Sequence, residues 1–200
     1  MSSTKFPAFL EGKNVYLTPH NLVFTDDFVR WMNDEDVRIY TATCYPVAHS
    51  YEEAWIRSYT EKNDEHKVSL VIIVRDASGD DKPIGVIALS RINYIDGTAT
   101  TGTIIGPKEF WGQGYGTEAK MLLLRYAFLT LNLRKISSQV IAYNTRSVAY
   151  ARKCGYVEDG GPMKAHVFKN GAYHDMVQLA VFREAWIPLW EAYKAKYGLE

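Results

Sequence analysis

The sequence contains few cysteines, no excess of charge of either sign and no long apolar segment. Its two cysteines, Cys44 and Cys154, are far apart and form no CxxC pair or Cys/His cluster, which argues against a disulfide scaffold and a structural zinc site. Lys and Arg total 23 and Asp and Glu total 23, so the formal net charge is zero. This balance gives no reason to expect a nucleic-acid-binding protein or a polybasic membrane protein.

Apolar segments are equally short. No stretch approaches the ~20 apolar residues that span a membrane, and the first residues lack the apolar core of a secretory signal. Together with the scarcity of cysteine, this predicts a cytoplasmic protein with no metal site. The chain has 200 residues and a 47% hydrophobic fraction, enough for one domain, which we expect to cover residues 1–200.

The order of the predicted elements indicates an α/β (α+β) fold around one sheet. Three consecutive strands within residues 68–106 are predicted to form an antiparallel meander, because their connections are short. Two helices are predicted to begin at caps, one at Thr25 and one at Ser50, where Glu53 completes a capping box. We therefore expect a central, mixed and mostly antiparallel sheet flanked by helices, and not a doubly wound Rossmann sheet. The remaining elements are strands at 14–19, 135–142, 166–168 and 176–182, helices from Thr117 and from Asn144, and a C-terminal helical extension at about 184–198.

Residues 106–119, which read GPKEFWGQGYGTEA, join the end of a strand to the most apolar predicted helix. Gly112, Gly114 and Gly116 remove Cβ atoms at alternate positions, so the backbone can take unusual φ/ψ values and approach a ligand closely. The first amides of the following helix have no partner within it, and the helix dipole is positive at that end. The segment therefore predicts a phosphate-binding site.

Two common nucleotide motifs do not match this segment. Its G-x-G-x-G spacing differs from the G-x-G-x-x-G dinucleotide fingerprint, and no Lys-Ser/Thr pair follows the last glycine as in a P-loop. An antiparallel meander before the loop is also wrong for a Rossmann unit. The glycines alone do not distinguish a phosphate site from a glycine-rich turn that binds no ligand, so this alternative stays open.

Residues 110–119, FWGQGYGTEA, resemble the acetyl-CoA-binding motif of the GNAT N-acetyltransferases, and are most similar to the RimJ/RimL-like branch. Three more segments resemble that branch in the same order, namely NTRS at 144–147, KCGY at 153–156 and NGAYHD at 170–175. The resemblance covers residues from about 12 to 184. It implies a GNAT-like fold, acetyl-CoA as cosubstrate, and an N-acetyltransferase that moves the acetyl group to a primary amine by direct attack on the thioester.

The resemblance also implies which residues hold the cosubstrate. The amides of the glycine loop would bind the pyrophosphate, and the strand before the loop would bind the pantetheine arm. Asn144 would contact the arm, although its side chain could equally cap the following helix by accepting from the amide of Ser147. The implied cofactor-binding residues are Thr103, Ile104, Ile105, Gly112, Gln113, Gly114, Tyr115, Gly116, Thr117 and Asn144.

Catalytic residues are less clearly indicated. Many GNAT enzymes place a tyrosine, the acid for the leaving thiolate, where this chain has Ala151. Tyr150 is expected to point elsewhere, because adjacent helical residues differ by about 100° in direction. Resemblance to the RimJ/RimL-like branch implies Ser147 as proton donor to the thiolate and Asp159 as base, directly or through water. Asp159 also fits a solvated turn residue, and Ser147 an ordinary residue of a helix's first turn.

The predicted acceptor is a protein N-terminal α-amine or a small-molecule amine, with no nucleic acid or membrane as partner. The chain is expected to be a monomer or a homodimer, and the aromatic stripe from Trp186 to Tyr197 is expected to pack in the core or at a dimer contact. Two alternatives stay open. One is a non-catalytic acyl-CoA-binding or sensing module on the same fold, which Ala151 favours, and the other is an interaction protein that uses the fold as a scaffold.

Overall fold

The computed structural model describes residues 5–61, 64–75 and 80–198, and in these ranges nine strands form one sheet. The strand order is β1-β2-β3-β4-β5-β6-β9-β7, with β8 paired to β9. Every pair is antiparallel except β5 with β6. This confirms the predicted mixed, mostly antiparallel sheet. The strands are β1 (Leu10–Glu11), β2 (Val15–Thr18), β3 (Val68–Val74), β4 (Lys82–Asn93), β5 (Thr98–Ile105), β6 (Lys135–Ile141), β7 (Val157–Glu158), β8 (Met163–Lys169) and β9 (Ala172–Phe182).

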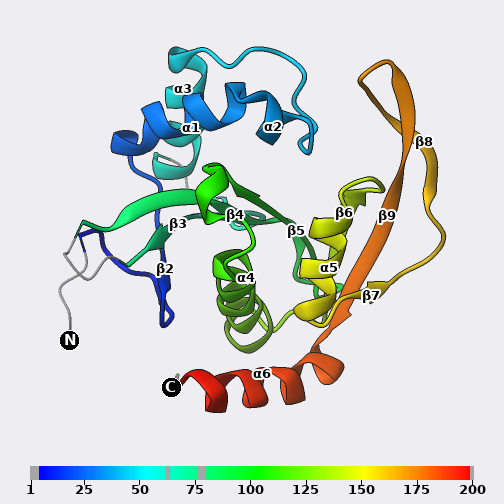
Figure 1. The fold of residues 1–200 in the computed structure, drawn as a ribbon. Helices are drawn as coiled ribbons and strands as arrows, with labels where there is room; N and C mark the ends of the chain where they lie inside the picture. Colours follow the sequence, from blue (N-terminus) through cyan, green and yellow to red (C-terminus); the bar gives the residue numbers. More distant parts are fainter. Residues whose placement is uncertain (1–4, 62–63, 76–79, 199–200) are drawn as a thin grey trace.

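Helices cover both faces of the sheet (Figure 1). One face carries α1 (Thr25–Asn33), α2 (Glu35–Arg38) and α3 (His49–Thr60), and the other carries α4 (Tyr115–Arg125), α5 (Thr145–Lys153) and α6 (Arg183–Tyr197). Short helical turns at Leu22–Phe24, Lys108–Phe110 and Tyr126–Thr130 join these elements. The hairpin of β8 and β9 extends away from the rest of the sheet (Figure 1).

The sheet is buried on both faces, and the alternation along β3 shows this directly. Leu70 and Ile72 pack into the core on the α4 side, while Val71 and Ile73 pack under α1 and α3. On the α4 side, Trp186 of α6 is fully buried. The aromatic stripe was predicted to pack either in the core or at a dimer contact. Part of it therefore packs in the core.

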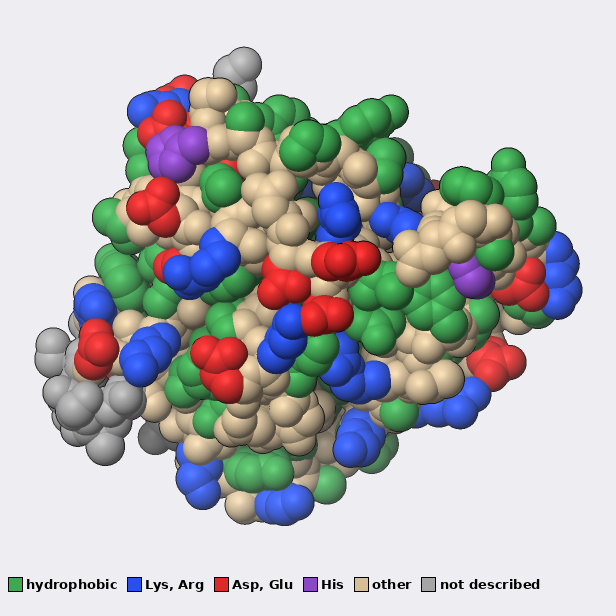
Figure 2. Space-filling model, turned by 45° about the horizontal axis from the view of Figure 1, so that its top comes forward, with side chains coloured by type: hydrophobic (Ala, Val, Ile, Leu, Met, Phe, Trp, Pro, Cys, Tyr) green, Lys and Arg blue, Asp and Glu red, His purple; other side chains and the backbone are tan. Residues whose placement is uncertain are grey.

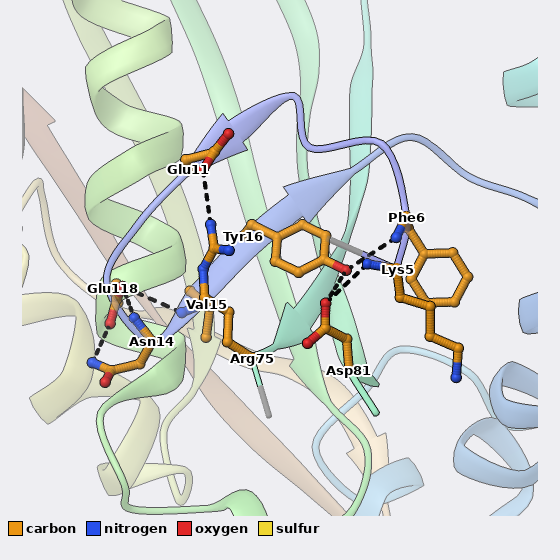
Figure 3. Close-up of polar contacts among 9 residues, drawn as sticks. All are labelled: Lys5, Phe6, Glu11, Asn14, Val15, Tyr16, Arg75, Asp81 and Glu118. Atoms are coloured by element: carbon orange, nitrogen blue, oxygen red, sulfur yellow. Dashed lines mark hydrogen bonds and ion pairs between the residues drawn. The ribbon is translucent and has the colours of Figure 1, made fainter. Parts of the chain in front are cut away.

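A buried carboxylate ties the N-terminal strands to α4 (Figure 3). Glu118 accepts hydrogen bonds from the Asn14 amide at 2.8 Å and the Val15 amide at 3.3 Å. On the same strand, the Tyr16 hydroxyl donates to Asp81 at 2.8 Å. These bonds fix the edge of the sheet against the helix that begins at the glycine loop.

Several helix boundaries differ from the sequence prediction because other residues provide the caps. The Thr25 hydroxyl donates to the Leu22 carbonyl and does not cap α1, and Asn21 caps the short turn before it. α3 begins one residue before Ser50, so the predicted capping box is wrong. α4 begins at Tyr115, two residues before the predicted start. The hairpin turn at Asn170-Gly171 is confirmed, with φ of 49° and 78°.

Charged side chains of both signs are interspersed on the face drawn in Figure 2, without a large area of one sign. Within the described ranges, no helix is both long and apolar enough to cross a membrane.

Candidate active site

A cleft opens where β5 and β6 separate. The two strands pair in parallel only from Thr98–Thr100 to Lys135–Ser137. Beyond that point β5 continues paired with β4 alone, and β6 continues paired with β9. Between them lies a cavity of about 640 Å³, which we call the cleft. Its size is typical of small-molecule sites.

The glycine loop closes one end of the cleft with unpaired backbone donors. Gly112 and Gly114 have φ of 76° and 90°, values that favour glycine. The amides from Gln113 to Thr117 have no acceptor among the described residues, and the first bonded amide is that of Glu118, which donates to the Gly114 carbonyl at 3.0 Å. A Cβ added at Gly112 or Gly114 would meet no atom within 4 Å. Free amides at the positive end of a helix, beside open space, fit a diphosphate group.

An aromatic ring and a cation lie beside this loop. The Trp111 indole donates to the Ile105 carbonyl at 2.8 Å, which holds the ring at the end of β5. The Arg146 guanidinium carbon lies 4.0 Å from the centroid of that ring, a cation–π distance. Both residues line the cleft, so a fixed positive charge stands near the free amides.

Most of the predicted cofactor residues line the cleft. These are Thr103, Ile104, Ile105, Gly112, Gly114, Gly116, Thr117 and Asn144. The side chains of Gln113 and Tyr115 point elsewhere, because Gln113 donates to the Glu109 carbonyl and Tyr115 packs on Phe110. Only their backbone amides are therefore available to a ligand. Asn144 accepts from the Ser147 amide at 3.1 Å, so it does cap α5.

The two predicted catalytic residues lie in different places. Ser147 lines the cleft, and its hydroxyl has no partner among the described residues. Asp159 does not line the cleft, and its carboxylate lies 2.6 Å from the Lys135 ammonium, at the start of β6. The structure thus brings Ser147 to the cosubstrate residues and leaves Asp159 in an ion pair away from them.

Two further residues that the sequence did not place in the site, Tyr150 and Lys120, also line the cleft. The Tyr150 hydroxyl lies 3.0 Å from Thr103 Oγ1 in the cleft, whereas its neighbour Ala151 is buried in the core and does not line the cleft. Burial raises the pKa of Tyr150 well above 10, which keeps the hydroxyl protonated. Lys120 is buried and donates to Thr101, and burial lowers the pKa of its ammonium to about 8. The sequence did contain a signal for the buried lysine, because Lys120 interrupts the apolar residues of α4.

A second cavity, of about 770 Å³, lies under α1 and α3 on the other side of β5. We call it the acceptor cavity, after the role that is proposed for it below. It meets the cleft along Ala42, Ser90 and residues 102–104, which line both. Two buried polar residues, Glu52 and Ser69, face it. Ser69 Oγ lies 2.8 Å from Nε2 of the buried His20.

The buried His20 predicts a loss of stability in mild acid. Burial lowers its pKa from 6.5 to about 4, so in that pH range the unfolded chain binds a proton that the folded chain does not. Stability is therefore complete above pH 6.5 and falls as pH drops towards 4, by about 3 kcal/mol in all. Chemical unfolding at a series of pH values measures this, and His20→Gln should remove this part of the pH dependence. The control is His166→Gln, at an exposed histidine, and an unchanged profile in His20→Gln would refute the assignment.

The cleft has free amides that fit a diphosphate, and it joins a separate cavity, so two ligands can lie side by side. The comparison with known families agrees. Residues 15–157 match the family described as Acetyltransferase (GNAT) domain. The chain belongs to this family, whose enzymes take an acetyl group from acetyl-CoA.

Two of the similar proteins have names that state what they act on. Spermidine N(1)-acetyltransferase of Vibrio cholerae serotype O1 is 34% identical over 104 residues, which is 52% of this chain and 59% of that protein. The Bacillus subtilis (strain 168) protein named "Putative ribosomal N-acetyltransferase YdaF" is 28% identical over 143 residues, 70% of this chain and 73% of that one.

Solved structures share the fold. The crystal structure of spermidine N-acetyltransferase from Vibrio cholerae in complex with CoA and spermine matches with a TM-score of 0.77 and 24% identity. The match covers 87% of this chain and 98% of that one.

Proposed function

We propose that this protein is an acetyl-CoA-dependent N-acetyltransferase that acetylates a primary amine. The observation that carries the proposal is the row of unpartnered amides from Gln113 to Thr117, at the end of a cleft made by the separation of β5 and β6. The join between the cleft and the acceptor cavity supports transfer between two bound molecules. Membership of the GNAT family supports acetyl-CoA as the donor.

The residues present fit the cosubstrate. Backbone amides at residues 113–117 would hold the pyrophosphate, with Arg146 adding positive charge. Residues 103–105 of β5 and Asn144 would hold the pantetheine arm. Acetyl-CoA, when bound, supplies the acetyl group as a thioester. Backbone N–H groups near the end of β5 would stabilise negative charge on the thioester oxygen.

Proton transfer is assigned to hydroxyls of the cleft. We propose that Ser147, whose hydroxyl is unpartnered, donates a proton to the departing thiolate, and that Tyr150 orients Thr103 beside it. Ser147→Ala is then expected to lower kcat by about 100-fold, the lower limit for a lost general acid. Tyr150→Phe is expected to lower kcat less, because it removes only an orienting hydrogen bond. Steady-state rates of CoA-thiol release measure both.

Asp159 provides the matched control. Its carboxylate pairs with Lys135 and does not line the cleft, and we therefore expect Asp159→Asn to keep kcat within about threefold of the wild type. If Ser147→Ala also keeps kcat within that limit, Ser147 is not the proton donor.

Placement in the RimJ/RimL-like branch is part of the proposal. The relative named as a ribosomal N-acetyltransferase supports a protein α-amine as acceptor, and the spermidine acetyltransferases support a small amine. The free thiols of Cys44 and Cys154 are consistent with the predicted cytoplasmic location. A monomer or homodimer stays the prediction for the assembly.

A non-catalytic acyl-CoA-binding module is the second candidate. The buried Ala151, at the place of the tyrosine acid common in GNAT enzymes, favours it. A mass-spectrometric screen of amines and N-terminal peptides with acetyl-CoA separates the two candidates. Acetylated product supports the enzyme, whereas tight CoA binding with no product from any amine supports the module.

A further inference from the structure

The acceptor cavity contains a buried carboxylate without a partner. Glu52, on the first turns of α3, is 6% exposed, and its carboxylate forms no hydrogen bond or ion pair with any described residue. Burial raises the pKa of this carboxyl group, with no interaction opposing the shift. A buried carboxylate in this state costs stability, so its presence needs a reason.

Other buried charged groups of the described chain are all bonded. Glu118 accepts from two backbone amides, Asp81 accepts from the Tyr16 hydroxyl, and Lys120 donates to Thr101. Glu52 differs from them, and it faces a cavity large enough for a small molecule. The missing partner of Glu52 is therefore expected from outside the protein.

The walls of the cavity restrict what that partner can be. Among the described lining residues, Glu52 is the one Asp, Glu, Lys or Arg, so no cationic side chain is present to bind a substrate carboxylate. Six aromatic side chains surround it, and aromatic faces attract cations and pack on apolar groups. They are Phe28, Trp31, Tyr45, Tyr51, Trp55 and Tyr59.

We propose that Glu52 pairs with the ammonium group of the acceptor, and that the acceptor is a monoamine with an apolar or aromatic body and no carboxylate. The single carboxylate of Glu52 can pair with one ammonium group. The other ammonium groups of a polyamine would have no carboxylate partner in this cavity. The cavity meets the cleft at Ser90 and Gly102–Ile104, which brings the amine to the thioester once the ammonium has given its proton to the Glu52 carboxylate. The inference rests on the proposed function and specifies its substrate.

Calorimetric titration of the CoA-loaded protein tests this with matched probes. Phenethylamine and phenethyl alcohol differ mainly in the charged group, while phenylalanine adds a carboxylate and spermidine adds charges. We expect phenethylamine to bind best of the four and to lose affinity by about tenfold or more in Glu52→Gln, as for a lost charge-assisted hydrogen bond. Phenethyl alcohol should bind the two proteins equally. Glu53→Gln is the control, because Glu53 is on the same helix but faces His49.

Several results would overturn the inference. These are no binding of phenethylamine, equal affinity in Glu52→Gln and the wild type, or tighter binding of phenylalanine or spermidine. CoA binding is measured separately: if CoA binds and phenethylamine does not, the inference fails and the proposed function stands. If CoA does not bind, the proposed function fails, and titration of the CoA-free protein still tests Glu52.

Thermal unfolding supplies a readout that is independent of any ligand. Glu52→Gln is expected to raise the melting temperature, because it removes an unpaired buried charge. Glu118→Gln should lower the melting temperature, because the Glu118 carboxylate accepts hydrogen bonds from Asn14 and Val15 that the substitution weakens. A lower melting temperature in Glu52→Gln would show that Glu52 has a structural partner, which contradicts the inference.

Discussion

Replacing Gly116 with valine is expected to weaken CoA binding by about 100-fold or more, which corresponds to roughly 2.7 kcal/mol. A Cβ at this position would lie 3.8 Å from Ile105 and 3.8 Å from Tyr150, at the wall of the cleft. The further methyl groups of valine would enter the space where the backbone must approach the phosphate chain. Gly116 lies within α4 and has no positive φ, so the fold should tolerate the change. Calorimetry with CoA measures the loss.

Gly116→Ala is the matched control for this substitution. It adds only the Cβ, at ordinary contact distance, and alanine favours a helix over glycine by about 0.5–1 kcal/mol. We expect it to melt at an equal or higher temperature and to bind CoA more tightly than the valine variant. If Gly116→Val binds CoA within about threefold of the wild type, the cosubstrate does not lie against this turn.

Replacing Gly85 with alanine is expected to be the most damaging change to the fold. An added Cβ would overlap the carbonyl oxygen of Ile104 on the neighbouring strand, and a backbone atom in the middle of a sheet cannot move away. We expect a loss of about 3 kcal/mol or more in the free energy of unfolding. Urea unfolding measures it, or the yield of folded protein if the variant does not fold.

Gly102→Ala controls for the loss of a glycine in the same pair of strands. Gly102 lies on β5, and its added Cβ would meet no atom within 4 Å. We expect stability equal to the wild type or greater by up to about 1 kcal/mol. If the two variants are equally stable, the close approach of β4 to β5 at Gly85 is not as described.

The glycine segment could be predicted from the sequence because its properties are local. Positive φ at Gly112 and Gly114 and free amides at a helix start follow from residue type and order. The Asn170-Gly171 hairpin is local in the same sense. Helix starts were less predictable, because Thr25 bonds backward to Leu22 and leaves capping to another residue.

The cleft and the acceptor cavity depend on contacts that no local pattern records. β5 and β6 pair only over three residues each, and each strand has its other partner elsewhere in the chain, β4 for β5 and β9 for β6. The contact of the Tyr150 hydroxyl with Thr103 could not be predicted from the sequence, because it depends on the position of α5 over β5. Glu52 reads in sequence as an ordinary polar residue of a first turn, and only the packing of α3 over the sheet buries it.

Amide NMR of the protein titrated with CoA and with pantetheine tests the binding of the cosubstrate most directly. Pantetheine lacks the phosphates, so we expect both ligands to shift the amide signals of residues 103–105, and CoA alone to shift those of residues 113–117 strongly. Unchanged signals from 113–117 at saturating CoA would contradict the phosphate site on which the proposed function depends.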